Sequence, residues 1–341
     1  MQLVITGGAG FLGARLARCL LERGSLALAG APPAAISRLI LVDRAAAPPD
    51  LAADARVQSV VGDLDTLLMP EGGSTPAVPP GTACVFHLAA AVSGECEADF
   101  DLGLRSNIDA TRALLQACRQ LETAPVLVFA SSLAVFGHSP EQPLPDVITD
   151  TTLPTPQTSY GIQKFIGEQL VADYTRKGFV RGRSVRPMTV SVRPGRPNGA
   201  ASGFLSGMLR EPLAGLKAAC PVDPDTTVAL ASPGRTIEGF VRAAEASAAD
   251  WGARTAINLP GLQTTPRQMA AALQRIAGQA ATDLIDWTPD PAVRRIVATW
   301  PGNVRADRAR GLGLAPDADF DAILADYVRE NPDAAPLAQR R

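Results

Sequence analysis

The chain has 341 residues, of which 46% are hydrophobic and 19% charged, the composition of an ordinary folded protein with a sizeable core. Its formal net charge of -2 at pH 7 offers no basic surface to a nucleic acid or an anionic membrane. No apolar run approaches the length of a membrane span, and we expect no secretory leader because a strand-like segment begins at Gln2. We therefore expect a cytoplasmic protein that binds neither nucleic acid nor membrane.

The cysteines and histidines give no sign of a metal site. The spacing contains no C-x-x-C pair and no grouping of cysteine with histidine that is typical of zinc. We expect reduced, buried thiols and no metal cofactor. These residues are Cys19, Cys84, Cys96, Cys118, Cys220, His87 and His138.

Short apolar runs alternate with amphipathic stretches over the first 194 residues. Such alternation predicts an α/β fold, a Rossmann-type doubly wound parallel sheet with helices on both faces. Beyond this point proline and glycine interrupt the pattern, so we expect a smaller α/β substrate lobe over residues 195–341, interleaved with the first domain, 1–194. The expected strands are 2–6, 38–43, 57–61, 83–88, 126–130 and 189–193, and the expected helices include 11–23, 108–121, 159–177, 266–278 and 319–330.

A glycine-rich turn joins the first expected strand to the first helix. Gly7, Gly10 and Gly13 form a G-x-x-G-x-x-G pattern, and Phe11 and Leu12 open the helix. Glycines let backbone N–H groups approach a pyrophosphate, and the helix N-terminus adds partial positive charge. Taken alone, the pattern is also compatible with a purely structural turn. Its place at the start of a βαβ run favours a dinucleotide site.

Two later aspartates stand where parallel strands end. Asp43 closes the second expected strand, where a carboxylate can bind the adenosine ribose and repel a 2′-phosphate, which favours NAD over NADP. Arg44 follows it and could offset part of that repulsion. Asp63 and Leu64 follow the third expected strand and could meet the adenine, although a turn aspartate is nearly as plausible.

A tyrosine and a lysine share one face of an expected helix. Tyr160 and Lys164 are four residues apart, so an ammonium can lie near a phenol and favour its ionised form. Ser131 and Ser132 follow the fifth expected strand and could orient a substrate oxygen. A surface pair is the usual explanation of Tyr-x-x-x-Lys. The glycine turn and the serine pair upstream favour proton transfer instead.

Together these motifs resemble the extended short-chain dehydrogenase/reductase family, of the NAD-dependent epimerase/dehydratase type. The resemblance covers nearly the whole chain. The motifs are TGGAGFLG (6–13), GDL (62–64), HLAA (87–90), Asn107, SSLAVFG (131–137) and YGIQK (160–164).

This resemblance implies a role for each matching residue. Tyr160 would be the acid/base, Lys164 its partner and a ribose ligand, and Ser132 the catalytic hydroxyl; Tyr160 and Ser132 would also contact the substrate. The further residues that it places against NAD are Leu88, Ala89, Ala90, Asn107, Ser131 and Pro194. It also implies a homodimer, formed by packing of the expected helices 108–121 and 159–177.

Departures from the sugar-nucleotide members narrow the substrate. Trp300 stands where those members often carry an arginine that binds a nucleotide phosphate. The stretches 192–204, 257–265 and 284–301 are similar to members that oxidise a four-carbon sugar acid, which implies NAD-dependent oxidation of D-erythronate at C2. An acid needs a cationic partner, and Arg196 is our first choice, ahead of Arg235, Arg294 and Arg305.

Two other functions remain open from the sequence. The same residues could serve an epimerase or dehydratase of a nucleotide sugar, which recycles its NAD. A non-catalytic NAD sensor would need the glycine turn and would have no use for the serine, tyrosine and lysine.

Overall fold

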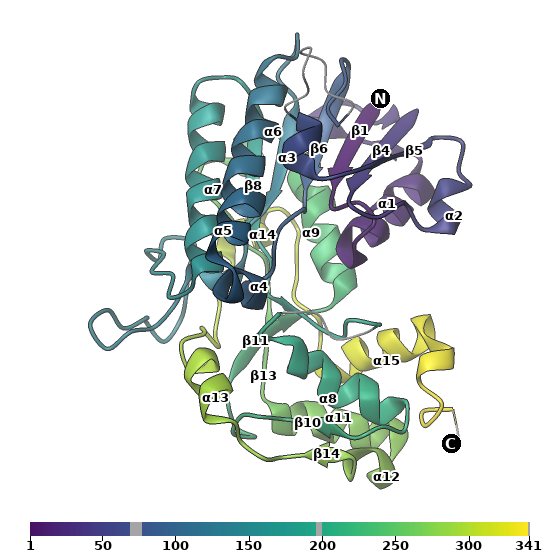
Figure 1. Ribbon diagram of the computed structural model, residues 1–341, viewed down its shortest axis with the longest axis vertical. Helices are drawn as coiled ribbons and strands as arrows, with labels where there is room; N and C mark the ends of the chain where they lie inside the picture. Colours follow the sequence, from purple (N-terminus) through teal and green to yellow (C-terminus); the bar gives the residue numbers. More distant parts are fainter. Residues whose placement is uncertain (69–76, 196–199, 340–341) are drawn as a thin grey trace.

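The computed structural model describes residues 1–68, 77–195 and 200–339. Within these ranges, the centre is a seven-stranded sheet in the order β12-β8-β7-β6-β1-β4-β5 (Figure 1). Its pairings are parallel. The strands are β1 (Gln2–Thr6), β4 (Arg38–Asp43), β5 (Val57–Val61), β6 (Thr82–His87), β7 (Val126–Ala130), β8 (Arg181–Arg186) and β12 (Ile257–Asn258).

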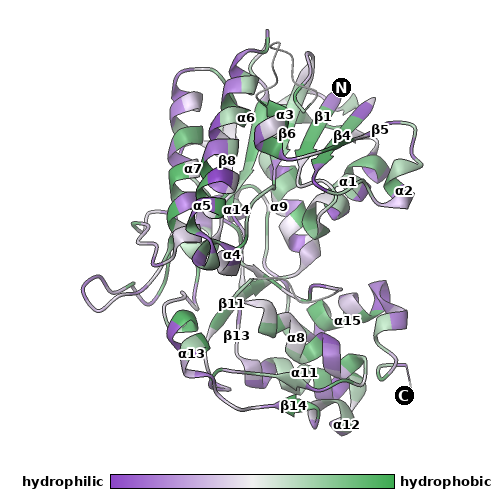
Figure 2. Cartoon of the chain, viewed as in Figure 1, coloured by the Kyte–Doolittle hydropathy of each residue, from purple (hydrophilic) through white to green (hydrophobic). Residues whose placement is uncertain are grey.

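Apolar side chains project from both faces of this sheet. Leu3 and Ile5 of β1 belong to one buried cluster, whereas Val4 between them belongs to another. A strand buried on both faces is a continuous apolar run, because helices cover each side. Figure 2 shows this hydrophobic character along β4 and β6.

Helices cover the two faces as two separate layers. One layer consists of α1 (Phe11–Arg23) and α9 (Pro233–Glu245), and the other of α3 (Leu64–Leu68), α6 (Ala110–Arg119) and α7 (Ser159–Arg176). The predicted Rossmann-type doubly wound sheet is therefore confirmed. Short connecting elements are β2 (Ser25–Leu26), β3 (Ala34–Ala35), α2 (Pro49–Ala52), α4 (Ser93–Ala98), α5 (Phe100–Gly103), a π-helical turn (Leu104–Asp109) and α10 (Ala248–Trp251).

The later part of the chain builds a second hydrophobic cluster. Its helices and strands lie below the central sheet in the view of Figure 1. Its strands form a three-stranded sheet and a two-stranded one. The strands are β9 (Thr189–Val190), β11 (Val228–Ala231), β13 (Leu262–Thr264), β10 (Ala218–Ala219) and β14 (Ile285–Asp286), and the helices are α8 (Gly203–Leu213), α11 (Pro266–Ala277), α12 (Gln279–Thr282), α13 (Pro291–Val297) and α15 (Phe320–Glu330).

Segments beyond residue 194 also return to the first layer. α9 covers one face of the sheet, β12 extends its edge beside β8, and α14 (Asp307–Gly311) packs near β12. The proposed division at residue 194 stays a prediction. In the described ranges, no helix is both long enough and apolar enough to cross a membrane.

The sixth strand of the sheet lies earlier than the sequence suggested. We expected it at 189–193, but only Thr189–Val190 forms a strand there, and that strand belongs to the small sheet. β8 has the sequence RGRSVR, which does not look like a buried strand. Its Arg183 and Arg186 are nevertheless buried, because Arg183 donates to two carbonyls and Arg186 pairs with a carboxylate.

The close approach of α7 to the sheet depends on Gly167. A Cβ atom there would lie 2.5 Å from Cζ of Phe129, a buried ring of β7. We expect Gly167→Ala to lower the free energy of unfolding by about 1–3 kcal/mol, because the helix must move away from the sheet. Urea denaturation followed by circular dichroism measures this change.

Gly207 in α8 is the matched control. A Cβ there would meet only the end of the Glu211 side chain, at 3.3 Å, and no backbone atom. Gly207→Ala should raise stability by about 0.5–1 kcal/mol, as alanine does in an unobstructed helix. A stabilised Gly167→Ala variant would contradict the packing described here.

Candidate active site

A cavity of about 1010 Å³ lies at the carboxyl ends of the central strands. Ligands of open parallel sheets bind at this edge, where the strand order reverses. Here the reversal falls between β1 and β6, because β4 and β5 lie on one side and β7, β8 and β12 on the other. The residues that line the cavity just after these strands or at their ends include Gly7, Asp43, Gly62, Leu88, Ser131 and Pro187.

The glycine turn leaves no room for side chains at two of its positions. Gly7 has a φ of +72°, and a Cβ atom there would lie 2.8 Å from the backbone nitrogen of Ala89. A Cβ at Gly13 would lie 2.0 Å from the carbonyl oxygen of Gly7. The first turn of α1 carries no acidic residue, and Gly10, its N-cap, lines the cavity with Phe11 and Leu12. This cradle fits the pyrophosphate of a dinucleotide.

Asp43 braces the glycine turn and faces the cavity. Its carboxylate accepts hydrogen bonds from the backbone N–H groups of Ala9, at 3.0 Å, and Ala45, at 3.2 Å. The neighbouring Arg44 forms an ion pair with Asp63, whose oxygen lies 2.5 Å from its Nε. That ion pair reduces the attraction Arg44 could offer to a 2′-phosphate. The arrangement therefore fits the ribose hydroxyls of NAD better than NADP.

The segment after β6 forms another wall of the cavity. Leu88, Ala89 and Ala90 line it, as does Leu64 opposite. Asn107 lies behind this wall and is buried. Its amide accepts from the backbone N–H of Ala91 at 2.9 Å and donates to the same residue's carbonyl at 3.2 Å. Asn107 thus supports the wall from behind and does not line the cavity itself.

Local packing brings Ser132 and Tyr160 together. Thr158 caps α7 by accepting from the N–H of Gly161 at 3.1 Å. A Cβ at Gly161 would lie 2.1 Å from the carbonyl oxygen of Ala134, so the glycine lets α7 begin against the turn that follows Ser132. Ser132 and Tyr160 both line the cavity and are partly exposed to it.

Lys164 lies one turn further along the same face of α7. Its ammonium is 5.6 Å from the centre of the Tyr160 ring and donates to the carbonyl of Ala130 at 2.9 Å. The side chain is buried, and burial lowers the pKa of Lys164 to about 8. Burial also raises the pKa of Tyr160 to about 12, while a hydrogen bond with Ser132 and the charge of Arg193 act in the opposite direction.

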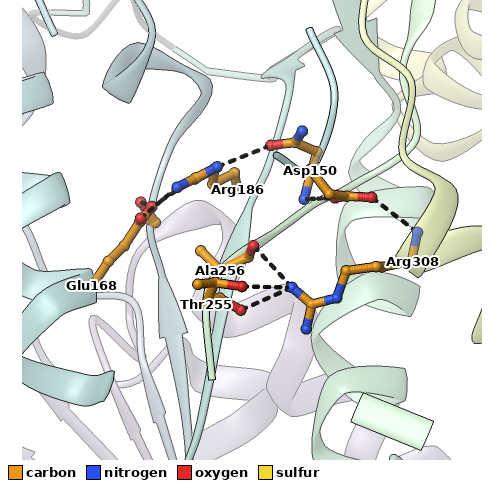
Figure 3. A network of polar contacts seen from close by, with 8 residues as sticks. Asp150, Glu168, Arg186, Thr255, Ala256 and Arg308 are labelled. Atoms are coloured by element: carbon orange, nitrogen blue, oxygen red, sulfur yellow. Dashed lines mark hydrogen bonds and ion pairs between the residues drawn. The ribbon is translucent and has the colours of Figure 1, made fainter. Parts of the chain in front are cut away.

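A buried ion pair supports α7 beneath the lysine. Both oxygens of Glu168 accept from Arg186 of β8, at 2.8 and 2.7 Å, and Ser131 donates a third hydrogen bond. The Ser131 hydroxyl is therefore already engaged at the edge of the cavity. Figure 3 shows the pair at one end of a longer polar network.

The network continues into the later part of the chain. Arg186 reaches the side chain of Asn258 at 3.5 Å, and the backbone N–H of Asn258 donates to Asp150 at 3.2 Å (Figure 3). Asp150 also accepts from the backbone N–H of Arg308. Arg308 in turn donates to the carbonyls of Thr255 and Ala256, just before β12, so α14 is joined to the edge of the sheet that carries the site.

Some predicted residues lie elsewhere. We expected Pro194 beside the cofactor, but it lines a second, smaller hollow. Pro187, which the sequence analysis did not select, lines the main cavity instead. Arg196 lies outside the described residues. Arg235 pairs with Glu238 and Arg305 with Asp307, and Arg294 lies on α13, away from the cavity lining.

Other residues of the cavity were missed by the sequence reasoning. They come mainly from the segment that follows β8, from the loop before α8 and from α13, whose irregular sequence pattern gave no signal of a site. They include Met188, Thr189, Val190, Arg193, Ala201, Ser202 and Ile296. Trp300, noticed in the sequence as a substitution, also lines the cavity.

Residues 3–234 match the model of the NAD dependent epimerase/dehydratase family. The chain belongs to this family. The family prediction and the cofactor prediction, NAD, are thereby confirmed, and the glycine cradle and Asp43 fit that cofactor.

Two curated relatives span almost the whole chain. D-erythronate dehydrogenase of Cupriavidus necator is 49% identical over 331 residues, which cover 97% of this chain and 98% of that protein. D-erythronate dehydrogenase of Haemophilus influenzae is 38% identical over 330 residues, 96% of this chain and 99% of that protein. A crystal structure described as a nucleoside-diphosphate-sugar epimerase from Agrobacterium tumefaciens matches with a TM-score of 0.86 and 36% identity, covering 98% of this chain and 95% of that one.

The position of Asp43 predicts how the cofactor is selected. Asp43→Ala should weaken NAD binding about tenfold and raise the efficiency with NADP relative to NAD, because the ribose loses a charged acceptor and a 2′-phosphate meets less repulsion. Titration of each cofactor and kcat/KM for each measure the change. Asp50→Ala is the control, since Asp50 pairs with Arg18 away from the cavity. An unaltered NAD-to-NADP ratio would remove Asp43 from cofactor selection.

Proposed function

We propose that this protein oxidises D-erythronate at C2 to the 2-oxo acid, with Tyr160 as the proton acceptor and NAD as the hydride acceptor. The prediction of an NAD-dependent dehydrogenase acting on a CH–OH group is confirmed by the two dehydrogenases to which the chain is similar over nearly its full length. The observation that carries the mechanism is the meeting of Ser132, Tyr160 and Lys164 in one cavity.

Each side chain has one task in the proposed step. Ser132 holds the C2 oxygen, while the C2 hydroxyl proton moves to the Tyr160 phenolate and the C2–H bond gives up its hydride. A carbonyl forms at C2. Lys164 keeps one donor on the Ala130 carbonyl and can direct the others to the nicotinamide ribose. Bound NAD supplies the hydride acceptor and a positive charge. Gly7, Gly10, Asp43 and Lys164 would hold it.

The second candidate is epimerisation of a nucleotide sugar. It is favoured by the description of the solved structure from Agrobacterium tumefaciens. Trp300 argues against a nucleotide-sugar substrate, because an indole in the cavity wall cannot neutralise a nucleotide phosphate as an arginine does. The two functions differ in the fate of the cofactor, since an epimerase regenerates its NAD.

Incubation with NAD and a panel of tetronates and pentonates tests the proposal. We expect one NADH to accumulate for each D-erythronate consumed. Tyr160→Phe should retain NAD affinity and lose about 100- to 10,000-fold in turnover, because the proton acceptor is gone. Tyr174→Phe, on the same helix beside Phe179, is the control and should remain active. Conversion of a nucleotide sugar without net NADH would contradict the proposal.

The pH profile of the same assay supplies a second readout. Oxidation needs the ionised phenol, and burial raises the pKa of Tyr160 to about 12. The oxidation rate should therefore increase with pH on the alkaline side of neutrality, and the reverse reduction should decrease. A profile for oxidation that falls as pH rises from 7 to 8 would argue against a tyrosine base.

We also propose a homodimer formed through α7 and its neighbours. Phe100 is 59% exposed, Ile162 47% and Ile166 40%, and the two isoleucines lie on one face of α7. Ile166→Glu should yield monomers in sedimentation velocity, whereas Leu216→Glu, a change at another exposed apolar residue, should not. A monomeric wild-type protein would contradict this assembly. The cytoplasmic location stays a prediction.

A further inference from the structure

One arginine of the cavity lining is partly buried and forms no ion pair among the described residues. Among the described residues that line the cavity, the cations are Arg44, Arg105, Lys164 and Arg193. Arg44 is paired with Asp63, Lys164 contacts the Ala130 carbonyl, and Arg105 is exposed on the π-helical turn. Arg193 is partly buried, and within the described parts of the chain it forms no ion pair with a carboxylate.

The second cluster fixes Arg193 in place. Its Nη2 donates to Oγ of Ser202 at 3.1 Å. Its backbone N–H donates to Ser206 at 3.0 Å, and its carbonyl accepts from Arg210 at 2.8 Å. Ser206 and Arg210 belong to α8, and Ser202 is the N-cap of that helix. The guanidinium is therefore positioned at the N-cap of α8, with donors left over for another group.

Arg193 also lies close enough to Tyr160 for their charges to interact. The charge of Arg193 favours the ionised form of the Tyr160 phenol, while burial and the nearby Arg210 lower the pKa of Arg193 itself. A partly buried cation without an anion is costly, and an anionic ligand offsets that cost. The proton acceptor and a free guanidinium thus face the same space.

We propose that Arg193 binds the C1 carboxylate of the substrate and thereby selects both the acid and the carbon that is oxidised. This inference rests on the proposed function. A guanidinium grips a carboxylate through two parallel hydrogen bonds, which fixes the plane of that group. The hydroxyl nearest the carboxylate is the one on C2. Holding C1 at Arg193 therefore presents the C2 hydroxyl to Tyr160 and keeps C3 and C4 away from it.

Steady-state kinetics of Arg193→Gln and Arg193→Lys test the proposal. We expect Arg193→Gln to raise KM for D-erythronate about 10- to 100-fold, with NAD affinity unchanged, because a charged, two-pronged contact is lost. Arg193→Lys should recover part of the loss, since it keeps the charge but not the fork. Arg235→Gln, an arginine paired with Glu238 outside the cavity lining, is the control and should behave as wild type.

A neutral substrate gives a readout that a structural defect would not. Wild type should strongly prefer D-erythronate over its amide, and Arg193→Gln should lose most of that preference. If Arg193→Gln does not fold, the acid-to-amide preference of Arg193→Lys is measured instead, and it should be lower than that of wild type. An unchanged KM, or an unchanged acid-to-amide ratio in a folded variant, overturns the assignment.

Failure of the proposed function would look different. If wild type oxidises no sugar acid, the thermal stabilisation of the NAD-bound protein by D-erythronate still tests Arg193 as a carboxylate site. Stabilisation in wild type that is lost in Arg193→Gln supports the site without the reaction. Equal stabilisation of both proteins, or no stabilisation of wild type, removes Arg193 as a carboxylate ligand.

Discussion

The buried ion pair between Glu168 and Arg186 is the constraint on which the arrangement of the site depends. A buried carboxylate is costly unless its oxygens are satisfied, and here a paired arginine and the Ser131 hydroxyl satisfy them. The three groups come from α7, β8 and the end of β7, so the pair fixes these elements relative to one another. Tyr160, Lys164 and Glu168 follow at four-residue intervals on one face of α7, so the ion pair also fixes the position of the proposed acid/base pair.

Two parts of the molecule form opposite walls of the cavity. The glycine cradle and the residues proposed for proton transfer and for the ribose contact come from the sheet and the helices on it. The wall that faces them includes Arg193, Ile296 and Trp300, from segments that pack with the second cluster. This division explains how one family can keep its chemistry and change its substrate, because recognition lies on separate elements. Asp150 joins β12 and α14 at the edge of the sheet, because it accepts from the backbone N–H groups of Asn258 and Arg308.

Much of the first half could be predicted from the sequence because local signals and tertiary needs agree there. β1 and α1 have the bounds expected from apolar periodicity, and the glycine turn lies between them. β8 was missed because arginine is a poor signal of a buried strand, and its burial depends on Glu168, which is distant in sequence. Because the strand was predicted too late in the sequence, Pro194 was predicted beside the cavity, where the structure has Pro187.

The substrate side was harder to predict for a related reason. Its residues converge from α13, the segment after β8 and the loop before α8, and no spacing rule joins such segments. Arg193 and Arg196 are three residues apart, and only the fold shows that the first is anchored by Ser202 in the cavity wall. Burial and partners, rather than residue type, decide which arginine can meet a ligand.

The return of α9 and β12 to the central sheet bears on how the protein forms during synthesis. α9 supplies buried residues such as Ile237 and Phe240 to the cluster over one face of that sheet. A nascent chain that has emerged only as far as residue 194 carries β1 to β8 but leaves this face partly bare. The central sheet cannot be completed during synthesis until the segment through β12 has left the ribosome. A truncated chain that ends before α9 would expose an apolar face of the sheet and would be prone to aggregate.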